Sequence, residues 1–153
     1  QQQVRVSSSL IRQALAAGDM KTANLMLDRP YSLWGKVVTG QQLGRTIGFP
    51  TANLQLATEK FLPRFGVYAV DVLLEQTTEQ PTIKGVMNIG CRPTVAGAAP
   101  TIEVHLLNWS GDLYGQTLKV NLMQFIRPEQ KFDSLEALKQ QIKQDCQLVL
   151  ESS

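Results

Sequence analysis

The stretch Gly66–Leu74 reads GVYAVDVLL, and every second residue of it lies on one face of an extended chain: Tyr68, Val70, Val72 and Leu74. A period of two is typical of a β-strand that buries one face. The same alternation returns twice further along the chain, in the triplets Ile102, Val104, Leu106 and Leu118, Val120, Leu122. Residues 32–126 therefore predict several short strands.

The segments that separate these strands are turn-like. Residues 76–81 (QTTEQP), 96–100 (AGAAP) and 108–112 (NWSGD) are short and rich in turn-forming residues. Successive strands without interleaved helices favour an antiparallel barrel or a sandwich. The alternation alone leaves both architectures open.

Helical patterns occur at the two ends of the chain. Near the start, Ser8 or Ser9 can cap one helix that Gly18 ends, and Asp19 can cap a second helix that stops before Pro30. The expected product is a short helical hairpin without a core of its own.

At the other end, Asp133 and Glu136 form a capping-box pattern for a C-terminal helix. An apolar stripe follows at helical spacing: Leu135, Leu138, Ile142, Cys146 and Val149.

Composition limits the class of protein. A chain of 153 residues with 43% hydrophobic residues is about one domain with a real core. A net charge of +2 without a dense basic stripe does not favour nucleic acid as a partner. Two cysteines, Cys91 and Cys146, make no disulfide framework and favour free thiols. Because no apolar run is long enough to span a membrane, we expect a cytoplasmic protein without a membrane partner.

The loop GRTIGFPTANL, residues 44–54, concentrates features that phosphate binding needs. Gly44 and Gly48 permit close backbone approach to a ligand. Thr51 and Asn53 offer the hard oxygen atoms that Mg²⁺ accepts. A plain turn is the alternative for such a cluster. The spacing fits neither the Walker nor the Rossmann pattern.

Four segments in order resemble the riboflavin kinase family. They are GQQLGRTIGFPTANL (Gly40–Leu54), NIGCRPTVAG (Asn88–Gly97), EVHLLNWSGDLYG (Glu103–Gly115) and RPEQKFDSLEALKQQI (Arg127–Ile142). The resemblance implies a six-stranded antiparallel Greek-key barrel with a C-terminal helix. It also implies phosphorylation of riboflavin at the ribityl 5′-hydroxyl by Mg·ATP, which gives FMN and ADP.

The resemblance assigns nucleotide-site roles residue by residue. Glu103 matches the catalytic base, and Thr51 and Asn53 match the pair that contacts Mg²⁺ and the ATP phosphates. Alternation independently places Glu103 on the strand face opposite Ile102 and Val104. His105 is a candidate nucleotide contact, and the surrounding flap supplies further candidates for the phosphates: Gly40, Gly44, Arg45 and Gly48.

For the flavin, the resemblance indicates the loop RPEQKF. Arg127 would make a polar contact, and Phe132 would stack on the ring or meet its edge. An isoalloxazine needs a flat apolar slot with a few polar anchors. Phe132 could equally fasten the C-terminal helix to the barrel, and Asn88 could equally hold loop geometry.

The run Ser7–Arg12 (SSSLIR) resembles the last motif of the adenylyltransferase module that precedes this kinase in bacterial bifunctional FAD synthetases. We therefore expect residues 1–30 to be a remnant of that module and residues 31–153 to be the kinase domain. The longer parent would also adenylylate FMN to FAD. The present chain should stop at FMN, because its only histidine is His105. Deleting residues 1–29 should leave kinase activity largely intact, because we expect these helices to be shaped for packing on the absent adenylyltransferase domain.

A non-catalytic β-barrel that binds flavin or oligonucleotides is the alternative from another class. Such a module reads bases through interleaved aromatic and basic residues on one face. Aromatic residues make up only 7% of this chain and are scattered.

Overall fold

The structure is a computed structural model that describes residues 8–38, 51–56, 61–74, 82–109 and 113–151. Within these ranges, none of the helices has the length and apolar character needed to cross a membrane. The elements in chain order are α1 (Ser8–Ala17), α2 (Met20–Leu27), β1 (Tyr31–Val38), β2 (Ala52–Leu56), β3 (Gly66–Leu74), β4 (Ile83–Thr94), β5 (Gly97–Leu106), β6 (Thr117–Arg127) and α4 (Leu135–Glu151).

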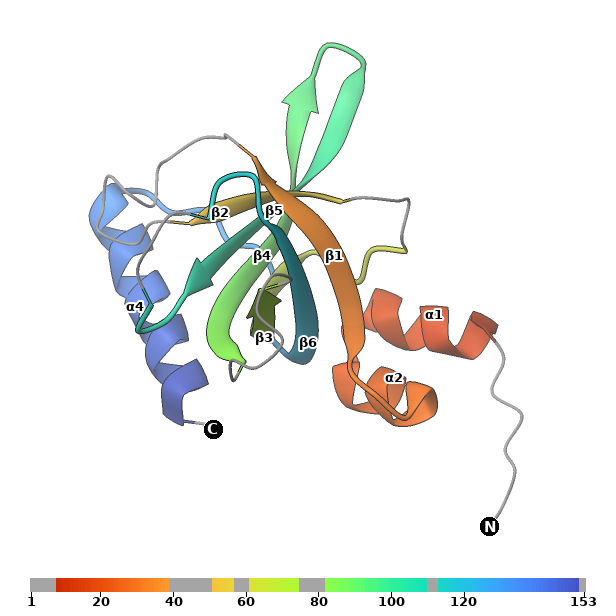
Figure 1. Cartoon of the computed structure of the whole chain (residues 1–153). Helices are drawn as coiled ribbons and strands as arrows, with labels where there is room; N and C mark the ends of the chain where they lie inside the picture. Colours follow the sequence, from red (N-terminus) through yellow and green to blue (C-terminus); the bar gives the residue numbers. More distant parts are fainter. Residues whose placement is uncertain (1–7, 39–50, 57–60, 75–81, 110–112, 152–153) are drawn as a thin grey trace.

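The six strands close into an antiparallel barrel in the order β1-β2-β5-β4-β3-β6 (Figure 1). Strands β3, β4 and β5 follow one another directly, and β6 then returns to pair with β3. A fourth strand that returns beside the first of three consecutive strands is the Greek-key arrangement. The expected barrel with its C-terminal helix and preceding helical hairpin is therefore confirmed.

The interior of the barrel is filled by the side chains that the alternation predicted. Tyr68 and Val72 on β3 are fully buried. The apolar residues of β5 and β6 complete the same cluster: Ile102, Val104, Leu106, Leu118, Val120 and Leu122. Because these residues point inward, the residues between them on each strand face outward.

Helices α1 and α2 cover one end of the barrel (Figure 1). Gly18 takes a left-handed conformation between them with φ 77°, and the Asp19 side chain caps α2 by accepting from the Thr22 amide at 3.1 Å. The predictions for Gly18 and Asp19 are confirmed, whereas Ser8 and Ser9 lie inside α1 and not at a capping position before it.

The expectation that this hairpin packs only on an absent domain is wrong. Leu15 and Met20 belong to the barrel core cluster. The backbone carbonyl of Leu15 accepts from the backbone amide of Arg64 at 2.9 Å, and the side-chain amide of Asn24 donates to the Leu122 carbonyl at 2.9 Å. The hairpin has no core of its own because it shares the core of the barrel.

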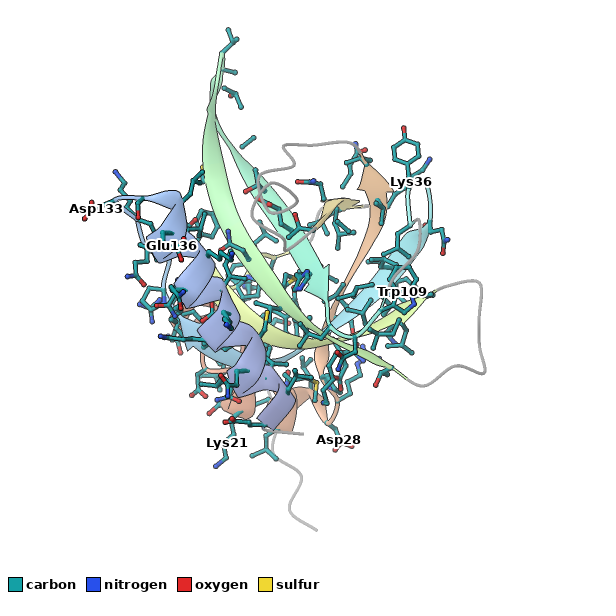
Figure 2. The ribbon with its side chains drawn as sticks, turned by 90° about the vertical axis from the view of Figure 1, so that its left-hand side faces the viewer. Lys21, Asp28, Lys36, Trp109, Asp133 and Glu136 are labelled. Carbon is teal, nitrogen blue, oxygen red and sulfur yellow. The ribbon has the colours of Figure 1, made fainter. Side chains whose placement is uncertain are left out.

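Helix α4 lies against the outer face of the barrel (Figure 2). It begins after Ser134, whose hydroxyl accepts from the Ala137 amide at 3.1 Å. The cap is therefore Ser134 and not Asp133. Ser134 directly precedes the first helical residue, Leu135, so its hydroxyl can accept from an amide of the first turn. A second apolar cluster joins α4 to the barrel through Ala69, Leu107, Cys146 and Val149.

Candidate active site

Three polar side chains form a row across the outer face of neighbouring strands. Glu103 on β5 lies directly opposite Asn53 on β2 and opposite Asn88 on β4. Residues that face each other across an antiparallel pair project to the same side of the sheet. The barrel register thus brings together residues that are far apart in the sequence.

Thr51 completes this group at the start of β2. Its hydroxyl donates to Oε1 of Glu103 over 3.4 Å. Burial raises the pKa of the Glu103 carboxyl above its ordinary value, and the hydrogen bond from Thr51 lowers it. A carboxylate whose pKa is raised in this way is a better proton acceptor than an exposed one.

A cavity of about 330 Å³ opens between this outer face and α4. The barrel contributes one wall, which includes Thr51, Asn88, Glu103 and His105. Opposite it lie α4 and the segment that leads into α4, through Glu129, Gln130, Phe132, Leu138, Ile142 and Asp145. The volume is in the range of small-molecule sites.

A buried ion pair lies in the lining of this cavity. Nε of Arg127 donates to Oδ1 and Oδ2 of Asp145 at 3.1 and 3.2 Å, and Nη2 donates to Oδ2 at 2.8 Å. The Asp145 side chain is only 3% exposed and that of Arg127 is 17% exposed. Gln141 adds a further donor to Oδ1 of Asp145 at 3.1 Å. The geometry is the bidentate fork that Arg makes with carboxylates.

The segment between β6 and α4 supplies an aromatic wall. The Arg127 guanidinium carbon lies 5.8 Å from the centre of the Phe132 ring. The same segment also approaches β4, since a Cβ added to Gly90 would lie 2.5 Å from Oε2 of Glu129. The absence of a side chain at Gly90 thus lets this segment approach β4 closely.

The charges around the cavity are mostly negative. Arg127 is the only Lys or Arg among the described lining residues, and Asp145 neutralises it. Glu103 and Glu129 remain as carboxyl groups. Such a lining suits an uncharged ring better than a phosphate group, which needs cations or free amides.

Of the six predicted site residues that the structure describes, five lie together. Thr51, Glu103, His105, Arg127 and Phe132 all line the cavity. Asn53 lies beside Glu103 in the register but is not part of the lining. The remaining predicted residues lie outside the described part of the chain: Gly40, Gly44, Arg45 and Gly48.

Two charged lining residues were missed by the sequence reasoning, Glu129 and Asp145. The signal for Asp145 was present, because it lies three residues after Ile142 and four before Val149, on the buried stripe of α4. A charged residue on such a stripe indicates a buried partner. For Glu129 the sequence carries no comparable signal.

Comparison with known proteins identifies the class of this barrel. The family model described as Flavokinase, riboflavin kinase, matches residues 27–153. This barrel, with its cavity beside α4 and the partly buried Glu103, thus belongs to a class of phosphotransferases. The chain belongs to the riboflavin kinase family.

Curated relatives are longer than this chain. The bifunctional riboflavin kinase/FMN adenylyltransferase of Escherichia coli K12 is 51% identical over 142 residues, which cover 93% of this chain and 44% of that protein. The protein of the same description from Bacillus subtilis 168 is 40% identical over 150 residues, covering 96% and 46%. The chain therefore spans less than half the length of these relatives.

Two solved structures share the fold. Riboflavin kinase from Trypanosoma brucei aligns with a TM-score of 0.55 and 28% identity, covering 80% of this chain and 79% of that chain. A crystal structure described as a macrolide-efflux protein from Streptococcus pneumoniae aligns with a TM-score of 0.87 and 37% identity, covering 94% of this chain and 46% of that chain. The second description concerns efflux, but the matched region has the same barrel.

Proposed function

We propose that this chain phosphorylates riboflavin at the ribityl 5′-hydroxyl with Mg·ATP and releases FMN and ADP. The observation that carries the proposal is the partly buried carboxylate of Glu103 at the wall of a cavity whose one described Lys or Arg, Arg127, is paired with Asp145. Such a cavity suits an uncharged flavin, and Glu103 is available to accept the proton of its hydroxyl.

The flavin ring is assigned to the space between the barrel and α4. Phe132, Leu138 and Ile142 provide apolar surface for a planar ring. Arg127 keeps guanidinium N–H groups that Asp145 does not use, and these serve as polar anchors. An isoalloxazine ring requires this combination of an apolar slot with a few polar groups.

The nucleotide is assigned to the edge where Thr51 and Asn53 precede and follow Ala52. Their hydroxyl and carboxamide are hard oxygen donors, which fits Mg²⁺. The described residues hold no cluster of three His, Cys, Asp or Glu side chains. Mg²⁺ is commonly bound by few protein oxygens together with substrate phosphates, where it neutralises phosphate charge during transfer. Glycines 40, 44 and 48 with Arg45 are proposed as the flap over the phosphates, and His105 as a nucleotide contact.

In the proposed step, the protein mainly positions its substrates. Glu103 accepts the proton of the riboflavin 5′-hydroxyl while the oxygen of that hydroxyl bonds to the γ-phosphorus of ATP. At the same time, the bond between the γ-phosphorus and the β,γ-bridging oxygen breaks. Thr51 holds the Glu103 carboxylate in place through their hydrogen bond. The phosphoryl group is therefore transferred to riboflavin, which becomes FMN, and ATP becomes ADP.

Product analysis tests this proposal. The whole chain is incubated with riboflavin, ATP and Mg²⁺, and the products are separated by chromatography. We expect FMN and ADP in equal amounts. A chain that binds riboflavin but forms no FMN would instead be a binding module, the alternative from another class.

Residues 1–30 are proposed as the end of an adenylyltransferase module and residues 31–153 as the kinase domain. What supports the proposal is that curated relatives are named for both activities and that the match to the kinase family begins at residue 27. We propose that a longer parent adenylylates FMN while this chain stops at FMN. The appearance of FAD in the same chromatogram would contradict that part of the proposal.

A further inference from the structure

The ion pair between Arg127 and Asp145 has no part in phosphoryl transfer as proposed above. It nevertheless lies in the wall of the cavity, since both residues line it. Asp145 is 3% exposed and accepts from three nitrogens, two of Arg127 and one of Gln141. Burying such a carboxylate is costly unless it is fully paired, which raises the question of what the pair does.

The fork fixes the guanidinium in one orientation. Nε and Nη2 of Arg127 both donate to Asp145, so one edge of the planar group is occupied. Nη1 donates to the Pro128 carbonyl at 3.4 Å. The N–H groups that remain are therefore held in a fixed direction rather than rotating with a free side chain.

The fork also cancels the charge of the only Lys or Arg among the described lining residues. An uncompensated guanidinium in a partly enclosed cavity would attract anions. Of the two flavins in the proposed reaction, riboflavin is uncharged and FMN carries a phosphate. The balance of charge at Arg127 thus bears directly on which of them is retained.

From this geometry we infer that Asp145 is a positioning and specificity residue, which orients Arg127 for the flavin and cancels its charge so that the cavity does not retain the anionic product. The inference rests on the proposed function, because it assumes that the cavity binds flavin. Asp145 acts through Arg127 and does not itself take part in the chemistry.

The inference predicts opposite effects of two single variants. Asp145→Asn removes a negative charge and leaves Arg127 uncompensated, so the affinity for FMN relative to riboflavin should rise. Arg127→Met leaves Asp145 uncompensated, so the same ratio should fall. For an uncompensated side-chain charge about 10 Å from the FMN phosphate, the affinity ratio should shift by about two- to tenfold in each direction. The double variant restores neutrality and should return the ratio close to the wild-type value.

Dissociation constants for riboflavin and FMN, measured by quenching of flavin fluorescence on the whole chain, give this ratio. The matched control is Asp71→Asn, which breaks the other described ion pair, Lys84 with Asp71 at 3.4 Å, neither of which lines the cavity. This variant should leave the ratio unchanged. Melting temperatures are measured in parallel, because a purely structural pair would change stability but not the ratio.

An unchanged ratio in Asp145→Asn, with riboflavin still bound, would overturn the inference and leave the proposed function standing. That outcome decides the question even if Arg127→Met does not fold. Single variants that shift the ratio in the same direction would also overturn it. Absence of riboflavin binding by the wild-type chain would overturn the proposed function and the inference together.

Discussion

At the scale of single residues, the chemistry depends on Glu103. The proposed base must be deprotonated to act, and replacing it with Gln keeps its shape while removing its basicity. General-base catalysis contributes about 10²- to 10⁴-fold, so Glu103→Gln should lower kcat on that scale. Flavin affinity should change little. An equal loss of riboflavin binding and turnover would make Glu103 a binding residue instead.

Thr51 offers a test through pH. Burial raises the pKa of Glu103, and the Thr51 hydrogen bond partly opposes that shift. Activity should fall as pH falls through the pKa of Glu103, because the base becomes protonated. Thr51→Val removes the opposing hydrogen bond, so the remaining activity should be lost at a higher pH than in wild type. A pH profile of kcat/KM that keeps its acidic limb in place would contradict this role.

Asn53 can be separated from Thr51 because the described hydrogen bond to the Glu103 carboxylate comes from Thr51 and not from Asn53. If it supplies oxygen to the Mg·ATP complex, Asn53→Ala should raise the Mg²⁺ concentration needed for half-maximal activity. The acidic limb of the pH profile should not move. Near-normal turnover at low Mg²⁺ would rule the assignment out.

At the scale of elements, the start of α4 tests which residue is the cap. Ser134 accepts from the Ala137 amide, so Ser134→Ala should lower the free energy of unfolding by about 1 kcal/mol. Asp133→Ala is the matched control and should have a smaller effect. Denaturant unfolding of both variants checks this, and the reverse order would restore the capping box expected from the sequence.

The helical hairpin gives a second prediction about elements. Leu15 is 1% exposed and part of the barrel core, so Leu15→Ala should cost about 2–5 kcal/mol of unfolding free energy. Leu25 on α2 is 78% exposed, and Leu25→Ala should cost little. Similar unfolding curves for the two variants would show that the hairpin is dispensable, as the sequence alone had suggested.

At the scale of the whole molecule, local patterns predicted the barrel and remote contacts decided the rest. Alternation identified the inward residues of β3, β5 and β6 because a strand has the same period wherever it lies. It could not pair Arg127 with Asp145, since that contact depends on how α4 packs. The sequence reasoning also misjudged the hairpin, because its apolar residues pack against a barrel whose strands come later in the chain. The capping-box spacing pointed to Asp133, whereas the next residue, Ser134, caps the helix.

The central claim is that flavin binds between the barrel and α4, within reach of Glu103. Leu138 lines this cavity, whereas Leu148 on the same helix does not line it and is 44% exposed. Leu138→Trp reduces the space for a ring, and Leu148→Trp makes the same change elsewhere on α4. Riboflavin titration of both variants, followed by flavin fluorescence, is the direct measurement. We predict that Leu138→Trp weakens binding at least about tenfold while Leu148→Trp binds like wild type; equal, undiminished binding by both would contradict the account.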